Sequence, residues 1–245
     1  MAGASRGGLK VSPKVEFGWA RARILCVFVA VACVTGAGLG ARANDAATYI
    51  DIGNNEIGAP PAEFDMPRQG EDKQGKWTIV HDGTATAGVA IEQSGVENTE
   101  EDRFPLAISK TVPLRNVEIS LRLKATGGTT DRDGGIALLL RTPNNYYLVQ
   151  LDALRDRVLF SLVTDGVPNE IVGVDADIAS HTWHTLAVRA KDDQFIVSLD
   201  GTWVFTGFDR TLSQPGRVAL WTKGDSITRF DSIVITPLPA AAERY

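Results

Sequence analysis

Cysteine is almost absent from this sequence of 245 residues, which contains only Cys26 and Cys33, both near the N-terminus. Such a chain has no disulfide framework, no cysteine nucleophile and no structural zinc held by thiolates. Histidine is nearly as scarce. His81, His181 and His184 show no metal-binding spacing, which argues against a metal centre built on histidine.

The sequence also lacks an excess of positive charge, since its formal net charge is −5. Residues 44–245 alone carry 19 basic and 29 acidic side chains, a formal charge of −10. A surface of this sign repels phosphate backbones and anionic lipid. We therefore predict no nucleic-acid partner.

Residues 1–43 are typical of a secretory signal peptide. The segment before residue 24 contains five basic residues and a single acid, Glu16. An apolar run follows at 24–39, and Ala41-Arg42-Ala43 then has the small-x-small form of a cleavage site. A membrane anchor and a lipid anchor on Cys33 are the alternatives, although a spanning helix needs about 20 apolar residues. We predict an exported protein, periplasmic or extracellular, with no integral membrane association after cleavage.

Strand patterns dominate the remaining sequence. Val117, Ile119, Leu121 and Leu123 alternate with polar residues, which predicts a strand with one buried face. Asp-Gly pairs at 82–83, 165–166 and 200–201 separate β-branched and aromatic runs, and Asp-Gly is a strong hairpin signal. The predicted fold is all-β: an antiparallel two-sheet sandwich of the jelly-roll kind with about a dozen strands.

The predicted domain organisation follows from these patterns. Residues 1–43 are the signal peptide, 44–75 an irregular N-terminal arm, 76–238 the β-sandwich and 239–245 a C-terminal tail. We find no convincing helix and no internal repeat of the kind a propeller needs.

Several motifs resemble the bacterial 3-keto-disaccharide hydrolase family, which belongs to the concanavalin A-like lectin/glucanase superfamily and shares features with laminin-G-like domains. They lie mainly in strands and turns between residues 134 and 235: GGIA at 134–137, NNYY at 144–147, LDA at 151–153, WH at 183–184, LDG at 199–201, PGRVALWTK at 215–223 and FD at 230–231. The resemblance implies a sandwich fold and activity on 3-keto-glycosides. The acid-x-acid-x-x-acid strand of the glucanase relatives is absent, so no catalytic residues are carried over.

A candidate carbohydrate site follows from the alternation of side chains in the strand at 146–152. Tyr146, Gln150 and Asp152 share one face of that strand, and a ring, an amide and a carboxylate suit the apolar face and hydroxyl rim of a sugar. Arg141 ends the preceding strand, and Trp221 with Lys223 forms another half-polar set. The other tryptophans Trp77, Trp183 and Trp203 are predicted to be structural and buried, and His184 to be a hydrogen-bonded histidine at the core.

Carboxylates offer two further hypotheses. Asp131, Asp133, Asn144 and Asn145 are weak candidates for calcium ligands, with ordinary turn chemistry as the alternative. No other cofactor is predicted. Glycoside cleavage needs two carboxyl groups about 5–10 Å apart. No confident pair emerges from the options, which are Glu118, Asp152, Asp175, Asp177 and Asp225.

Three function classes remain open at this point. The first is an exported carbohydrate-binding sandwich without catalysis. The second is a hydrolase or lyase acting on 3-keto-glycosides, as the resemblance implies. The third is a non-catalytic protein-interaction module of the laminin-G type.

Overall fold

The computed structural model describes residues 46–67, 75–94 and 104–240. The predicted signal peptide and residues 241–245 of the predicted tail lie outside the described residues. The described ranges hold fifteen strands and no helix, and accordingly no helix there is long and apolar enough to cross a membrane. The all-β prediction is confirmed.

Eight strands form the first sheet, all paired antiparallel. Seven of them follow the order β13 (Thr202–Phe208), β12 (Gln194–Leu199), β11 (His184–Lys191), β6 (Val117–Gly127), β15 (Ile227–Pro237), β4 (Val89–Ser94) and β3 (Lys76–His81). The short β1 (Thr48–Tyr49) pairs with β15.

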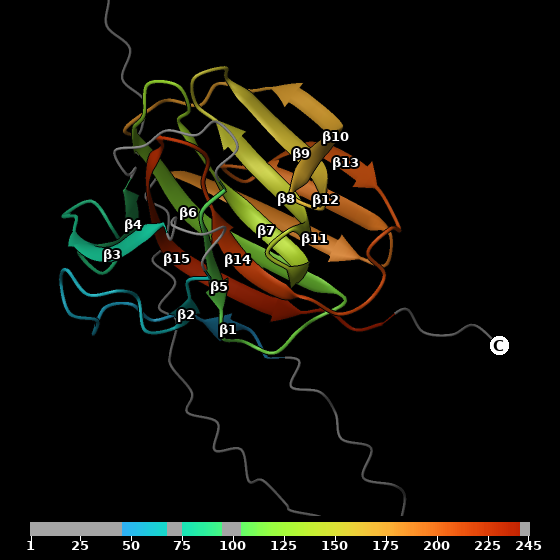
Figure 1. The fold of residues 1–245 in the computed structure, drawn as a ribbon, viewed down its shortest axis with the longest axis horizontal. Helices are drawn as coiled ribbons and strands as arrows, with labels where there is room; N and C mark the ends of the chain where they lie inside the picture. Colours follow the sequence, from blue (N-terminus) through green and yellow to red (C-terminus); the bar gives the residue numbers. More distant parts are fainter. Residues whose placement is uncertain (1–45, 68–74, 95–103, 241–245) are drawn as a thin grey trace, which may run out of the picture. The chain divides into compact units, whose positions relative to one another are not determined.

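Seven strands form the second sheet, also antiparallel. Their order is β10 (Val167–Asp175), β9 (Arg157–Thr164), β8 (Asn145–Asp152), β7 (Asp133–Thr142), β14 (Arg217–Trp221), β5 (Leu106–Ser109) and β2 (Phe64–Asp65). Figure 1 shows the two sheets stacked face to face, with β8, β7 and β14 adjacent in one layer. β1 and β2, two residues each, lie in the predicted arm.

The main core lies between the two sheets. The alternation predicted for β6 holds, because Val117, Ile119, Leu121 and Leu123 are all at most 1% exposed. Tyr147 and Phe160 of the seven-stranded sheet pack against Phe195 of β12 in the other sheet. The centroids of the three rings are 4.6–5.6 Å apart. Burial of a large apolar side chain contributes about 1.5–3 kcal/mol, so this layer stabilises the sandwich.

Two of the three Asp-Gly pairs form the tight turns that the sequence predicts. Asp200 and Gly201 have φ values of 51° and 78°, and Asp165 and Gly166 of 52° and 83°. Positive φ at both central residues is the mark of the hairpin turn that suits twisted strands. Asp82 instead begins a longer connection between β3 and β4 and is buried among cations.

The outer face of the seven-stranded sheet is also largely buried. A second cluster of apolar side chains lies there, on β5, β7, β8, β9 and β14. Its rings include Tyr146 and Trp221, each 1% exposed. Phe104, just before β5, stacks on Trp221 with centroids 5.7 Å apart and planes 20° apart.

Candidate functional site

The pairing of β7 with β8 places carboxyl groups opposite each other at one end of the seven-stranded sheet. Asp133 pairs in register with Asp152, and Gly135 pairs with Gln150. Because side chains two residues apart share a face, Asp133, Gln150 and Asp152 all lie on the outer face. A Cβ on Gly135 would lie 2.4 Å from the Val149 carbonyl oxygen, so no side chain fits there.

Asp133 is the central group of this site. Its side chain has no exposed surface, and neither carboxylate oxygen has a hydrogen-bond partner among the described residues. Burial, together with the charge of the neighbouring Asp152, raises the pKa of Asp133 to about 7. The nearby Gln150 amide lowers this pKa in part, without reaching hydrogen-bond geometry. Asp133 is thus poised to exchange a proton near neutral pH.

Two ion pairs flank Asp133. Lys223 Nζ lies 2.8 Å from Asp131 Oδ1, and the other Asp131 oxygen is buried without a partner. Arg155 Nη1 lies 2.8 Å from Asp152 Oδ2, and the backbone N–H groups of residues 154 and 155 donate to Asp152 Oδ1. We call these six residues the Asp133 cluster: Asp131, Asp133, Gln150, Asp152, Arg155 and Lys223.

The loop that carries Asp131 is held by Asp225, just after β14. The backbone N–H groups of residues 129, 130 and 131 all donate to the Asp225 carboxylate. Although burial alone would raise the pKa of Asp225, these bonds lower it to about 2. Asp225, a sequence candidate for catalysis, therefore has a structural role in positioning Asp131.

With Asp133 protonated, the charges of the cluster balance, since two carboxylates face one lysine and one arginine. The carboxyl groups are buried, whereas the side chains of Lys223 and Arg155 are 28% and 54% exposed and Gln150 is partly exposed. Lys223 and Arg155 supply hydrogen-bond donors and the carboxylates supply acceptors, while the Gln150 amide can donate and accept.

The structure brings together three of the six predicted carbohydrate-site residues, namely Gln150, Asp152 and Lys223. Tyr146 and Trp221 lie on the same face but have no ring surface available for a sugar. Trp221 Nε1 donates to the Tyr146 hydroxyl at 3.2 Å, and both side chains are buried. The stacking role predicted for the two rings is therefore wrong, because this face carries its own apolar cluster.

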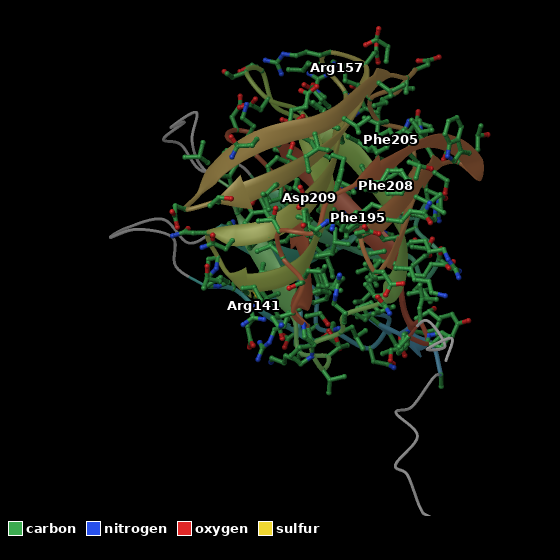
Figure 2. The ribbon with its side chains drawn as sticks, turned by 90° about the vertical axis from the view of Figure 1, so that its right-hand side faces the viewer. Arg141, Arg157, Phe195, Phe205, Phe208 and Asp209 are labelled. Carbon is green, nitrogen blue, oxygen red and sulfur yellow. The ribbon has the colours of Figure 1, made fainter. Side chains whose placement is uncertain are left out.

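Arg141 lies at the other end of the sheet. Figure 2 shows it at the opposite end from Arg157, which pairs in register with Asp152. Thr142, next to Arg141, pairs with Asn145, and Asp152 lies seven positions further along β8, about 23 Å of extended chain. Arg141 consequently cannot join Asp152 in one site as predicted.

The four weak calcium candidates are also divided. Asp133 begins β7 and Asp131 lies two residues before it, whereas Asn144 lies in the turn after β7 and Asn145 begins β8. There the Asn144 N–H and the Asn145 amide both donate to Thr142 Oγ1, which is ordinary turn chemistry. Among the described residues, no group of three or more His, Cys, Asp or Glu is arranged to hold a metal ion.

The remaining sequence candidates have other roles. Glu118 forms an exposed ion pair with Arg189, and Asp175 and Asp177 are exposed. His184 is confirmed as a hydrogen-bonded histidine at the core, with Nδ1 2.8 Å from Asp200 Oδ2 and Nε2 3.1 Å from the Ala179 carbonyl oxygen. Sequence reasoning missed Arg155 and the pairing of Asp133 with Asp152.

The other tryptophans differ from one another. Trp77 is 3% exposed, as predicted, whereas Trp203 on the edge strand β13 is 64% exposed, so its predicted burial is wrong. Trp183 is half-buried, with Arg122 and Lys124 within 4.8 Å and 4.7 Å of its ring centre. Its Nε1 donates to Thr84 Oγ1, so this ring is tied into a polar network.

Comparison with known proteins finds no matching family model and no matching curated protein. Solved structures do match. Carbohydrate-binding module CBM66 from Bacillus subtilis has a TM-score of 0.55 and 19% identity, over 66% of this chain and 91% of its own. A Bacillus subtilis protein of unknown function with a galectin-like fold has a TM-score of 0.50 and 6% identity, over 66% and 86%.

A β-glucanase from Bacillus licheniformis has a TM-score of 0.47 and 14% identity, over 69% of this chain and 95% of its own. At such identities a likeness shows the fold alone. The likeness therefore agrees with the two-sheet antiparallel sandwich fold, while the 3-keto-disaccharide hydrolase family in particular is not shown.

Proposed function

We propose that the protein is an exported carbohydrate-binding sandwich and that the Asp133 cluster is its ligand site. The unpartnered, fully buried carboxyl group of Asp133 carries this proposal. Leaving such a group unsatisfied costs about 1–3 kcal/mol or more. Ligand hydroxyl groups can recover that cost, since they donate to carboxylates and accept from Lys, Arg and Gln.

A neutral polyol also suits the charge of the site. The cluster is balanced when Asp133 is protonated, so a ligand without charge enters without leaving an uncompensated ion. We infer that a ligand approaches past Lys223, Arg155 and Gln150, because their side chains are the partly exposed members of the cluster. One of the neighbours in fold is named a carbohydrate-binding module, which agrees with this proposal.

Calorimetric titration with a panel of neutral mono- and oligosaccharides tests the proposal. Asp133→Ala and Gln150→Ala should each lower the affinity at least about tenfold, which corresponds to about 1.4 kcal/mol. Asp193→Ala is the matched control, because this partly exposed side chain lies in the connection between β11 and β12, in the other sheet. Absence of binding by the unaltered protein, or unchanged affinity in Asp133→Ala, would refute this function.

A second candidate function is cleavage of glycosides, including the 3-keto-glycosides that the sequence resemblance implies. The supporting observation is the Asp133–Asp152 pair: one carboxyl group with a pKa raised to about 7 faces another that is ion-paired with Arg155. A protonated acid beside a carboxylate is the arrangement that glycosidic cleavage uses. Residues paired across antiparallel strands have Cβ atoms about 4.5–5.5 Å apart. Both carboxyl groups can therefore contact the same glycosidic bond.

Incubation with 3-keto-disaccharides and aryl glycosides tests the second candidate. Product release that is abolished by both Asp133→Asn and Asp152→Asn would support cleavage. Saccharide binding without any product would leave the binding function alone. For export, sequencing of the mature N-terminus should begin at Asn44, and a retained leader would contradict that part of the proposal.

A further inference from the structure

A cleft of about 440 Å³ opens at the end of the seven-stranded sheet that carries Arg141, between the β7–β8 turn and the segment before β14. Arg141 and Arg217 both line it. Its apolar lining includes Ile108, Leu140, Pro113 and Pro215. This volume is within the range of small-molecule sites, and a few polar groups on apolar walls are typical of them.

The cleft is shaped by an irregularity in β7. The register with β8 shifts between Leu138 and Thr142, and the register with β14 shifts between Arg217 and Ala219. Leu139, inside this bulge, has a φ of 48°, in the left-handed region that branched apolar residues rarely adopt. Bulges redirect side chains and recur beside functional sites, and this one precedes Arg141 by two residues.

The wall of the cleft is closely packed at Gly216. Gly216 exchanges two backbone hydrogen bonds with Leu114, of 2.9 Å and 3.0 Å. A Cβ on Gly216 would lie 2.2 Å from the carbonyl carbon of Leu139. The segment around Gly216, which lines the cleft, is therefore fixed in place by backbone contacts on both sides.

Positive charge gathers at this cleft although the protein as a whole is acidic. Arg141 Nη1 donates to the Pro215 carbonyl oxygen at 3.3 Å, and its other N–H groups make no side-chain hydrogen bond within the described part of the chain. Arg217 Nη1 lies 3.4 Å from Asp65, and Lys110 Nζ lies 3.8 Å from the same carboxylate. Asp65 is thus shared by two cations, and neither Lys110 nor Asp65 lines the cleft. Among the described residues that do line it, Arg141 and Arg217 are the charged ones, so the lining carries a charge of +2.

We propose that this cleft binds a small organic acid, that is, one carboxylate group carried on a compact ring. The guanidinium fork of Arg matches a planar carboxylate, and the proline and aliphatic walls match the ring. The formal charge of −10 on residues 44–245 favours a monoanion over a phosphate dianion, because long-range repulsion doubles with ligand charge. The ring can belong to an acidic sugar or to an apolar acid.

Two carboxylate probes distinguish these sources. Glucuronate presents the carboxylate on a sugar ring, and cyclohexanecarboxylate presents it on an apolar ring. Glucose and cyclohexanecarboxamide are their uncharged counterparts, and inorganic phosphate is the dianion control. Binding is followed by backbone amide shifts of Thr142 and Gly216 in nitrogen-15 spectra, which report on this cleft and not on the Asp133 cluster.

We expect at least one carboxylate probe to shift these amides, the uncharged counterparts to shift them at least tenfold more weakly, and high salt to weaken binding. Arg141→Gln and Arg217→Gln should each lower the affinity at least fivefold. Arg157→Gln, at the far end of the sheet, and Asp133→Ala should leave it unchanged. The site is refuted if neither carboxylate binds, if the arginine variants bind equally well, or if phosphate binds as tightly.

Discussion

Trp221 Nε1 donates a hydrogen bond of 3.2 Å to the hydroxyl group of Tyr146, and each side chain is 1% exposed. The two rings span β14 and β8 across β7, on the outer face of the sheet. Because the Tyr146 hydroxyl group is buried, its pKa is raised well above its usual range, and it stays neutral under all ordinary conditions. The pair therefore stabilises this layer and does not present an aromatic surface.

Tyr146→Phe should lower the free energy of unfolding by about 1–2 kcal/mol, because it leaves the buried Trp221 N–H without an acceptor. Saccharide affinity should not change. Urea denaturation and calorimetric titration of the same variant measure the two quantities. Lost binding with unchanged stability would show that the Tyr146 hydroxyl group contacts the saccharide, and would contradict its assignment to Trp221 alone.

Asp133→Asn should alter the pH dependence of stability. Folded Asp133 has its pKa raised to about 7, whereas an unfolded carboxyl group titrates near about 3.9. Between these values the folded state keeps a proton that the unfolded state has lost. Stability of the unaltered protein is therefore lost as pH rises from about 4 to about 7 and is level above that.

Asn does not titrate, so the variant does not lose this stability as pH rises. The free energy of unfolding of the variant minus that of the unaltered protein should therefore be about 1–3 kcal/mol larger at pH 7.5 than at pH 4.5. Guanidinium denaturation at the two pH values measures the difference. Parallel pH profiles for the two proteins would show that Asp133 is ionised throughout this range.

Asp225→Ala should release the loop at residues 129–131, since three backbone N–H groups lose their acceptor. The pKa of Asp225 is lowered to about 2, so its contribution is present above about pH 4 and is lost as pH falls toward about 2. We expect a loss of about 1–2 kcal/mol at neutral pH, together with weaker saccharide binding because Asp131 is displaced. Binding as tight as in the unaltered protein would show that Asp131 does not contribute to the site.

Gly135→Ala should destabilise the fold by about 3 kcal/mol or more, because the new Cβ would meet the Val149 carbonyl oxygen at 2.4 Å. Gly83→Ala is the matched control. Nothing lies within 4 Å of that position and its φ is not positive, so its effect should be within about 1 kcal/mol. Equal melting temperatures for the two variants would mean that β7 and β8 can separate locally at low cost.

The fold could be predicted because its signals are local. Asp200 and Gly201 specify a turn, and alternation along β6 specifies which residues enter the core, so neither needs knowledge of distant contacts. β1 and β2 were missed because two residues carry no detectable period. Their strand character comes from pairing with β15 and β5.

The candidate site was predictable only in part. Alternation correctly placed Gln150 and Asp152 on one face, but it cannot tell that this outer face is buried around Tyr146. The position of Asp133 depends on the bulge in β7. Counting back from the Thr142–Asn145 pair would set Gly135 opposite Asp152, whereas the shifted register sets Asp133 there. Bulges depend on tertiary packing, so one sequence does not reveal them.

The length of β7 has a consequence for ligands of different size. Asp133 and Arg141 stand near the two ends of this one strand, and eight extended residues span about 26 Å. A short molecule can engage only one end at a time. A ligand long enough to reach both ends could bind at both sites at once. Binding at the first site would raise its effective concentration at the second, which strengthens the overall binding.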